Sequence, residues 1–223
     1  MSDLGLPEDQ PKVVFSDADI LVLEKPAGVL SIADGYDQTL LHLSTILLPT
    51  WGKIWMVHRL DRETSGLMVV ARNPESHRIL NQQFRDHLVS KSYHAVVEPV
   101  PDWVEINLDA PLRVDADREH RTRVDFSRGK PAQTNLCVLK SNRDFALLEC
   151  QILTGYRHQI RAHLYSIGLN IMGDELYQPH KSVRSPKATR MLLHASKLGF
   201  NHPLSDEALH FESPDPIEFS SFI

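Results

Sequence analysis

The sequence predicts an α+β fold whose sheet is mostly antiparallel. Apolar runs of strand length outnumber the helical stretches, and several of these runs are separated only by short turns. That spacing favours antiparallel pairing. With 42% hydrophobic residues, the 223-residue chain can bury a substantial core, as one domain or as two closely fused lobes.

The N-terminal part predicts a hairpin followed by a helix. Two apolar runs, residues 13–15 and 20–23, flank an Asp17-Ala18-Asp19 turn, which is typical of a β-hairpin. Residues 37–48 carry apolar side chains at helical spacing. We expect this helix to end at Pro49, because proline interrupts the hydrogen bonding of a helix.

The rest of the chain alternates predicted strands and helices. Asn73-Pro74 opens a helix, because proline is favoured at the first helical position. Another helix over residues 157–167 ends at Gly168. Predicted strands lie at residues 67–71, 93–97, 121–126, 134–139 and 145–152. The last two are separated by an Asn142-Arg143-Asp144 turn, so we expect them to pair.

Composition excludes several classes of protein. Cys137 and Cys150 lie in alternating apolar runs, which indicates buried strand residues and neither a disulfide nor a metal pair. No signal peptide precedes the first predicted strand. No apolar run approaches the roughly 20 residues of a membrane-spanning helix. We therefore expect a soluble cytoplasmic protein that does not bind membranes.

The net charge of the whole chain is negative, but the middle of the sequence is basic. The formal net charge is −5, but residues 1–24 and 205–223 together carry eleven acids and one base, which leaves +5 for the remainder. Residues 157–197 hold seven Lys or Arg against Asp174 and Glu175. A local basic surface is what phosphate binding needs, although this segment alone also fits an ordinary solvated face.

The segment at residues 57–71 carries the most chemical information. It consists of VHRLDRETSG and the apolar run LMVVA, and it places one carboxylate, Asp61, between Arg59 and Arg62. A solvated loop can hold such a cluster for solubility alone. Here a Thr-Ser-Gly turn and a β-branched run follow. We therefore expect Asp61 at the mouth of a buried strand, where a rigid backbone can position a reactive group.

The order H-R-L-D-x-x-T-S-G resembles the catalytic motif of the RluA family of RNA pseudouridine synthases. Six further segments are similar to the family's K-P-x-G, K-x-Y, G-K-P-A-x-T, T-G-R-x-H-Q-[IL]-R, G-D and L-H-A elements, in the same order: residues 23–28, 91–93, 129–134, 154–161, 173–174 and 192–195. One position departs from the pattern. The arginine after T-G falls on Tyr156, and an arginine follows one residue later, at Arg157.

The resemblance implies the pseudouridine synthase fold, with a mixed, mostly antiparallel central sheet, flanking helices and a catalytic cleft. It is closest to the short members that lack an N-terminal S4 RNA-binding domain. We accordingly expect a mobile N-terminal segment at residues 1–12 and one catalytic domain over residues 13–223. The segment at residues 179–189 is also expected to be mobile.

The implied activity is isomerisation of a specific uridine to pseudouridine in structured RNA, either a 23S rRNA hairpin, a tRNA anticodon stem-loop or both. The bond from N1 to C1′ breaks, the uracil rotates, and C5 is joined instead, with no net redox change. No cofactor is therefore expected. RNA is the expected partner, DNA is not, and we expect a monomer.

The resemblance also assigns three catalytic residues. Asp61 would attack C1′ or remove the C2′ proton, and the sequence leaves both routes open. Arg161 would pair with Asp61 and keep it ionised, because a buried carboxylate otherwise tends to take up a proton. Tyr93 would stack on the uracil and assist removal of the C5 proton.

Several residues are expected by resemblance to contact RNA. The target nucleotide must be flipped out of its stack. Arg59 would fill the vacated space, although a phosphate contact is an equal alternative. The other candidate RNA-binding residues are His58, Thr64, Lys130, Arg157, His158 and Gln159.

Twelve histidines raise the question of a metal site. His158 and His163 come nearest to a helical ligand pair. Their spacing is five, whereas a spacing of four aligns two side chains on one helix face, and neither a cysteine nor a carboxylate completes a set. The sequence therefore predicts no metal.

Two other functions remain open. A non-catalytic RNA-binding protein that retains the fold would share the basic middle but would not need Asp61, Tyr93 and Arg161 together. An acid/base hydrolase using Asp61 would need a second carboxylate or a histidine partner, and Glu63 is the only candidate nearby.

Overall fold

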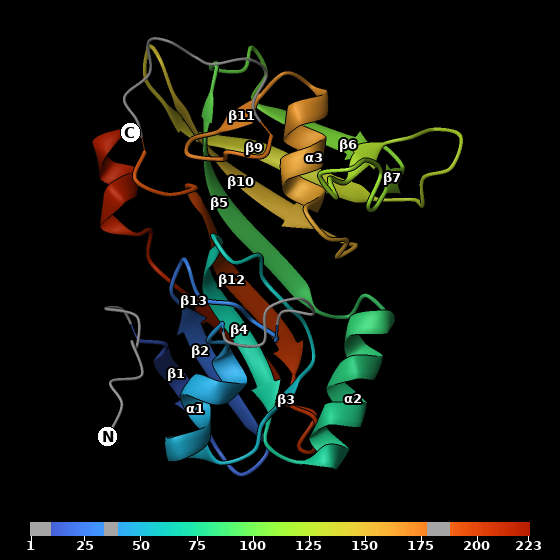
Figure 1. Cartoon of the computed structure of the whole chain (residues 1–223), viewed down its shortest axis with the longest axis vertical. Coiled ribbons are helices and arrows are strands. Elements are labelled where there is room, and N and C mark those ends of the chain that lie inside the picture. Colours follow the sequence, from blue (N-terminus) through green and yellow to red (C-terminus); the bar gives the residue numbers. More distant parts are fainter. Residues whose placement is uncertain (1–9, 34–39, 178–187) are drawn as a thin grey trace. The chain divides into compact units, whose positions relative to one another are not determined.

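The computed structural model describes residues 10–33, 40–177 and 188–223. The chain divides into two compact units (Figure 1). Unit 1 comprises residues 1–89 and 197–213, and unit 2 comprises residues 90–196 and 214–223. No helix in the described part of the chain is long and apolar enough to cross a membrane.

Unit 1 combines antiparallel strands with two helices. Its elements are β1 (Lys12–Ser16), β2 (Ile20–Lys25), α1 (Leu43–Trp51), β3 (Trp55–Met56), β4 (Ser65–Ala71), α2 (Pro74–Arg85), the C-terminal part of β12 (Leu193–Asn201) and β13 (Ala208–Glu212). The strand order is β1-β2-β4-β12, with β3 on β4 and β13 on β12. The predicted hairpin is thus confirmed as β1 and β2, which pair antiparallel.

The core of unit 1 forms because β2 and β4 are apolar on both faces. All seven residues of β4 are buried. Val22 lies opposite Val69 in the register of the two strands, and both belong to a cluster that also contains Leu80 of α2. Phe84 of the same helix packs against this cluster. Strands apolar on both faces must be covered on both sides, which holds the end of β4 rigid.

Both predicted helices of unit 1 exist, but one has different limits. Asn73 caps α2 as expected, because its side-chain oxygen accepts a hydrogen bond from the amide of Ser76 at 2.9 Å. Of the helix expected at 37–48, residues 37–39 lie outside the described residues. The helix begins at Leu43 and continues through Pro49 to Trp51. The prediction that Pro49 ends it is wrong. Proline removes one backbone donor, and over a single remaining turn this loss does not stop the helix.

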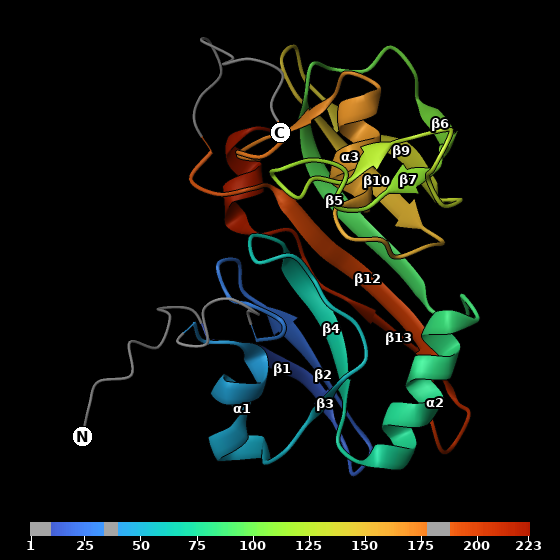
Figure 2. The same cartoon turned by 45° about the vertical axis from the view of Figure 1, so that its right-hand side comes forward.

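Unit 2 is also built on antiparallel strands. Its elements are the N-terminal part of β12, β5 (Ser90–Glu98), β6 (Glu105–Asp109), β7 (Leu112–Arg113), β8 (Arg123–Val124), β9 (Gln133–Ser141), β10 (Ala146–Ile152), α3 (Gln159–Ser166), β11 (Asn170–Ile171) and a 3₁₀ turn (Ile217–Ser221). The strand order is β12-β5-β10-β9-β6, with β11 on β5. Strands β7 and β8 form a separate two-stranded ribbon (Figure 2).

The predicted strands of unit 2 are confirmed except in one place. β9 and β10 pair antiparallel across the expected turn. The strand predicted at 121–126 shrinks to the two residues of β8. The physical reason lies in the flanking acids: Asp117 accepts a hydrogen bond from the amide of Arg121, and Asp125 accepts from the amide of Ser127. Backbone donors satisfied by side chains in this way do not extend a ladder.

Both cysteines lie in strands, as predicted, but only Cys150 is buried. Cys137 is half-buried, so the prediction of a buried residue is wrong there. In the register of β9 and β10, Cys150 lies opposite Leu136, whereas Cys137 lies opposite Glu149. Neighbouring positions point to opposite faces of a sheet, so the two thiols cannot form a disulfide. Cys150 is fully buried, and burial raises the pKa of its thiol. The mobile segments predicted from the sequence fall largely on residues 1–9 and 178–187, which lie outside the described residues.

Candidate active site

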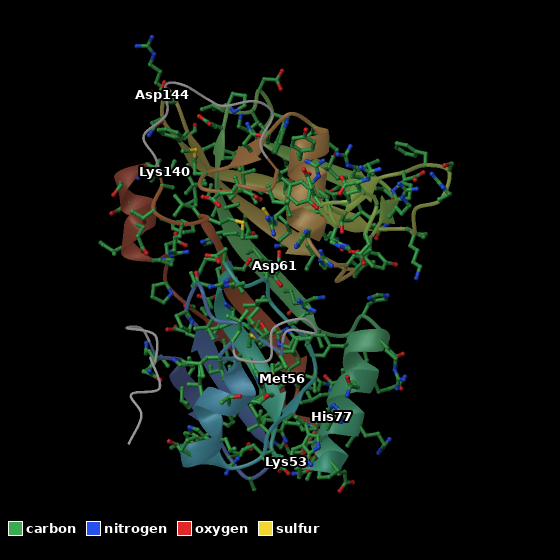
Figure 3. All side chains as sticks on the ribbon, in the orientation of Figure 1. Lys53, Met56, Asp61, His77, Lys140 and Asp144 are labelled. Carbon is green, nitrogen blue, oxygen red and sulfur yellow. The ribbon has the colours of Figure 1, made fainter. Side chains whose placement is uncertain are left out.

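Asp61 lies in a loop that leads directly into β4. Its backbone carbonyl accepts a hydrogen bond from the amide of Thr64 at 3.1 Å, which closes a turn. Thr64 is buried, and Ser65 begins the strand. Within unit 1, Asp61 is found at the end where β4 begins, away from the end that carries Lys53 (Figure 3). The prediction that Asp61 lies at the mouth of a buried strand is confirmed.

The peptide groups on both sides of Asp61 are fixed by side chains. The buried hydroxyl of Ser31 accepts from the amide of Leu60 at 3.0 Å and donates to its carbonyl at 2.8 Å. On the other side, the carbonyl of Arg62 accepts from the amide of Gly28 at 2.8 Å and from the ammonium of Lys25 at 3.0 Å. The K-P-x-G element therefore supports the loop of Asp61.

The side chain of Lys25 is buried, and the residue is only 1% exposed. Its ammonium also donates to the carbonyls of Pro26 and Val29, each at 2.8 Å. A buried cation is tolerated when its donors are satisfied. The sequence assigned no role to Lys25, and its place in the K-P-x-G element was the signal that could have revealed one.

The two residues before Leu60 behave differently. His58 accepts a hydrogen bond at Nε2 from the amide of Val69 at 3.0 Å, and its ring stacks on Phe84 at 4.7 Å between centroids. His58 thereby ties the loop to β4 and α2. Arg59 is exposed, and its side chain has no hydrogen bond or ion pair within the described residues. Their predicted contacts with RNA remain predictions.

In unit 2, Arg161 of α3 is held by a buried acid. Its Nε lies 2.7 Å from Oδ2 of Asp174, and its terminal nitrogen lies 2.9 Å from Oδ1. Asp174 is 1% exposed and also accepts from the amide of Tyr177. The preceding Gly173 has φ +77°, and a Cβ there would lie 2.0 Å from the carbonyl oxygen of Arg190. Only glycine fits, which explains the G-D element.

Tyr177 connects this arginine to β8. The guanidinium carbon of Arg161 lies 5.0 Å from the centre of the Tyr177 ring. The buried Tyr177 hydroxyl accepts from the amide of Thr122 at 2.7 Å and donates to the carbonyl of the same residue at 2.9 Å. Thr122 in turn donates from its hydroxyl to the carbonyl of Arg157 at 2.7 Å. Asp174, Tyr177 and Thr122 thus support Arg161, and the sequence assigned none of them this role.

The start of α3 carries the other candidates. Arg157 contacts Asp115 at 2.9 Å and the carbonyl of His120 at 2.6 Å. His158 has φ +56°, so the helix begins at Gln159 and not at 157 as predicted. The Nδ1 atom of His158 lies 3.3 Å from the hydroxyl of Tyr177.

Gln159 is 3% exposed and has partners on both ends of its amide. Its nitrogen donates to the carbonyl of Gln133 at 2.8 Å, and its oxygen accepts from the hydroxyl of Thr154 at 2.8 Å and from the amide of Tyr156 at 3.2 Å. Gln159 therefore joins the T-G-Y turn to β9. Its predicted contact with RNA remains a prediction.

The K-x-Y element lies on β5. Tyr93 is buried and pairs in register with Cys150 of β10. Lys91, two residues earlier, points to the same face of the strand. Burial lowers the pKa of Lys91 from 10.5 to about 8. A Cβ on Gly155 would lie 3.3 Å from its ammonium nitrogen. Lys130 has an exposed side chain, and its backbone pairs with Leu112.

The histidine pair considered for a metal has other functions. His163 is fully buried and donates from Nε2 to the carbonyl of Ala110 at 2.9 Å, so its Nδ1 accepts from the hydroxyl of Thr134 at 2.8 Å. Burial lowers the pKa of His163, although the hydrogen bond to the carbonyl of Ala110 acts in the opposite direction and raises it. Both ring nitrogens have protein partners. His163 is therefore not available as a ligand.

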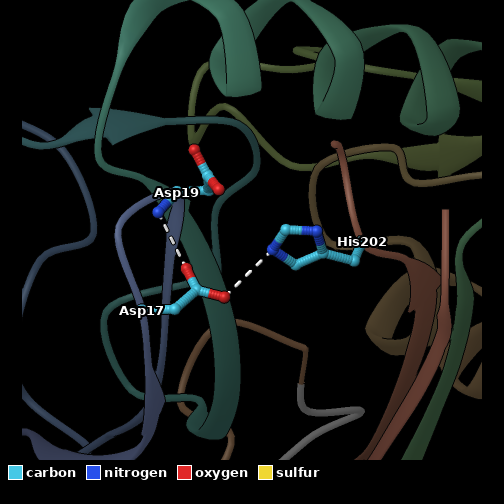
Figure 4. Close-up of side chains that lie close together, drawn as sticks. All are labelled: Asp17, Asp19 and His202. Carbon is cyan, nitrogen blue, oxygen red and sulfur yellow. Dashed lines mark hydrogen bonds and ion pairs between the residues drawn. The ribbon is translucent and has the colours of Figure 1, made fainter. Parts of the chain in front are cut away.

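A second group with possible ligand atoms consists of Asp17, Asp19 and His202, whose side-chain atoms lie within 4.8 Å of one another (Figure 4). Nε2 of His202 lies 3.0 Å from Asp17, whose other oxygen accepts from the amides of Asp19 and Ile20. Nδ1 of His202 accepts from the amide of Ser205 at 3.1 Å. The proton therefore lies on Nε2 and is donated to Asp17. This group ties two turns of unit 1 together.

The fold is that of pseudouridylate synthases. The chain superimposes on the solved structure titled Human RNA Pseudouridylate Synthase Domain Containing 1 with a TM-score of 0.78 and 26% identity, covering 93% of this chain and 84% of that one. For Human RNA Pseudouridylate Synthase Domain Containing 4, the TM-score is 0.75 at 25% identity, with 94% and 90% covered.

Sequence comparison gives the family. Residues 19–166 match the model of RNA pseudouridylate synthase. The chain is 36% identical to the Ribosomal large subunit pseudouridine synthase D of Zymomonas mobilis, covering 94% of this chain and 71% of the relative. It is 34% identical to the Dual-specificity RNA pseudouridine synthase RluA of Escherichia coli K12, covering 91% and 92%. The chain belongs to the RNA pseudouridylate synthase family and is an RNA pseudouridine synthase, an isomerase.

Proposed function

We propose that this isomerase converts one specific uridine of a structured RNA to pseudouridine with Asp61 as its catalytic carboxylate. One observation carries this proposal. Asp61 occupies a loop whose flanking peptide groups, at Leu60 and Arg62, are fixed by the buried side chains of Ser31 and Lys25. A carboxylate that must meet a single carbon or proton of a sugar benefits from such a rigid mount.

Arg161 is the proposed counter-ion of Asp61. Its fixed position supports this role, because Asp174 binds one edge of the guanidinium and Tyr177 covers its face. An arginine held in this way loses little conformational freedom when it acts. Tyr93 is the proposed stacking and proton-transfer group. Both routes for Asp61, attack at C1′ and removal of the C2′ proton, remain compatible with its position.

The proposed substrate is an RNA hairpin of 23S rRNA, of a tRNA anticodon arm or both. A loop nucleotide is the least costly to flip out, which favours a hairpin. The names of two relatives point the same way, one to the ribosomal large subunit and one to dual specificity. Arg59 is proposed to occupy the vacated space. His58, Thr64, Lys130, Arg157, His158 and Gln159 are proposed to contact or orient the RNA, in the cytoplasm and with the protein as a monomer.

Mapping of pseudouridine tests the proposal. Total RNA from cells with and without the gene is labelled with carbodiimide and read by primer extension, after complementation with wild type, Asp61→Asn or Glu63→Gln. We expect a site that disappears without the gene, returns with wild type and Glu63→Gln, and stays absent with Asp61→Asn. Glu63 is the matched control because it is an exposed carboxylate in the same loop.

Two results would count against the proposal. Restoration of the site by Asp61→Asn would remove Asp61 from catalysis. Loss of the site with Glu63→Gln as well would favour the two-carboxylate alternative. Purified Asp61→Asn should bind the target RNA with unchanged affinity, which separates a catalytic defect from an RNA-binding one.

A further inference from the structure

The turn after β8 presents an aromatic ring to solvent. Phe126 is 82% exposed, the highest exposure of any large hydrophobic side chain in the described residues. Single exposed apolar residues are common and need no explanation by themselves. The surroundings of Phe126 are what distinguish it.

The backbone that carries Phe126 is tightly constrained. Oδ1 of Asp125 accepts from the amide of Ser127 at 3.0 Å, from its hydroxyl at 2.7 Å and from the amide of Arg128 at 3.0 Å. The amide of Gly129 donates to the carbonyl of Asp125 at 2.7 Å. A Cβ on Gly129 would lie 2.4 Å from that oxygen, so the position requires glycine. A rigid turn can hold an exposed ring with little loss of backbone entropy on binding.

The same turn is basic. Residues 121–130 contain four bases, Arg121, Arg123, Arg128 and Lys130, and one acid, Asp125. That acid is turned inward and lies 3.4 Å from Arg113. The pKa of Asp125 lies below its usual range, and the hydrogen bond from the Ser127 hydroxyl is the largest cause. The charge of Asp125 is therefore used within the turn. Arg121 and Arg123 form ion pairs with Asp117. The exposed cations nearest to Phe126 in the sequence are thus Arg128, whose side chain is 72% exposed, and Lys130.

A flat aromatic ring beside exposed cations such as Arg128 and Lys130 is the chemistry that binds single-stranded nucleic acid. Bases stack on the ring, and the cations contact the phosphates. An apolar protein partner would instead favour a wider apolar patch with fewer exposed charges.

We propose that Phe126 stacks on an unpaired base of the RNA substrate, outside the base that is isomerised, and that the turn at residues 125–130 contributes to choice among hairpins. This inference rests on the proposed function, because it takes RNA hairpins as substrate. It adds a residue that sequence reasoning did not single out.

The test compares the full-length protein with Phe126→Leu and Phe126→Trp. The probes are a synthetic RNA hairpin with uridines in its loop and a continuous duplex of the same stem sequence, with affinity measured by fluorescence anisotropy at one salt concentration. We expect Phe126→Leu to raise Kd for the hairpin about tenfold, because base stacking on an aromatic side chain has that order of strength. Phe126→Trp should keep the affinity and show additional quenching of tryptophan emission on binding.

Ile217→Ala is the matched control. Ile217 is 81% exposed but lies between the acidic residues Asp215 and Glu218. Its substitution should leave Kd for both probes unchanged. Phe126→Leu should also leave Kd for the duplex unchanged.

Equal hairpin affinity of Phe126→Leu and wild type would overturn the inference, as would equal weakening of hairpin and duplex. Neither result would touch the proposed function, which stands or falls on the Asp61-dependent site in the RNA map. Conversely, absence of that site would remove the proposed function whatever the affinities of the Phe126 variants.

Discussion

At the scale of single residues, the candidate site depends on groups that are buried and charged. Arg161 and Asp174 form a bidentate ion pair with side chains 10% and 1% exposed. Lys25 is buried among three carbonyls. Burying each of these charges carries a desolvation penalty, which well-placed hydrogen bonds and ion pairs must offset. Substitutions at these positions therefore affect both stability and geometry.

Asp174→Asn tests the ion pair. Removing one charge of a buried pair leaves the other uncompensated, so we expect the free energy of unfolding to fall by about 3 kcal/mol, with lower activity in the protein that remains folded. Urea denaturation and single-turnover assays measure the two effects. The control is Glu218→Gln, which breaks the more exposed pair with Arg190 and should cost less than about 1 kcal/mol. Equal costs for the two variants would contradict the prediction.

The lowered pKa of Lys91 predicts that the stability of the protein depends on pH. Its pKa is about 8 in the folded protein against an ordinary value of 10.5, because burial disfavours the cation. Between these values the unfolded chain binds more protons than the folded one. The free energy of unfolding therefore rises with pH in this window, by at most about 1.4 kcal/mol per pH unit.

Denaturation of wild type and Lys91→Met from pH 8 to pH 10.5 measures this contribution. Lys91→Met should lack it. Lys140→Met, at an exposed position of β9, is the control and should keep the slope of wild type. A Lys91→Met protein with the wild-type slope would show that Lys91 is not the group responsible.

At the scale of elements, short sequence signals correctly predicted those helix starts and hairpins that depend on neighbouring residues. Asn73-Pro74 was sufficient to start α2, and the alternation around Asn142 was sufficient for the β9 and β10 hairpin. The errors came where side chains compete for the backbone. Asp117 and Asp125 shorten β8, and the positive φ of His158 delays the start of α3. The acids that shorten β8 lie only four and two residues from the amides that they bind, so the apolar pattern alone does not show whether these amides join a ladder or a side chain.

The β7 and β8 ribbon offers a prediction at this scale. Tyr177 binds both the amide and the carbonyl of Thr122, so Tyr177→Phe leaves two buried backbone groups without that partner. We expect a loss of about 1 to 3 kcal/mol in the free energy of unfolding. Hydrogen exchange at residues 121–124 should become faster. Tyr165→Phe, at a partly exposed tyrosine, is the control and should leave this exchange unchanged.

If exchange at residues 121–124 were the same in Tyr177→Phe and wild type, the ribbon would be held by other contacts. The prediction would then fail. The contact between Thr122 and Arg157 and the hydrogen bond from the amide of Arg121 to Asp117 are candidates for that role.

At the scale of the whole molecule, the α+β class and the antiparallel pairing followed from counting strands and turns, and both are confirmed. The family followed from seven short motifs and is also confirmed. The residues that support the candidate site could not be predicted from the sequence, because their contacts form only when segments distant in the sequence come together. Ser31 contacts Leu60, and Tyr177 contacts Thr122, across separations that no periodicity reveals.

Unit 1 is assembled from two separate stretches of the chain, residues 1–89 and 197–213, with residues 90–196 between them. β13 pairs with β12, and His202 binds Asp17, so both contacts need residues that are synthesised after residues 90–196. Domains made of continuous sequence can fold while synthesis proceeds. In this protein the loop of Asp61 is made before unit 2, but the unit that carries it becomes complete only after residues 90–196 have also been made. A translation product that stops before residue 197 would therefore contain the Asp61 loop without a finished unit to hold it.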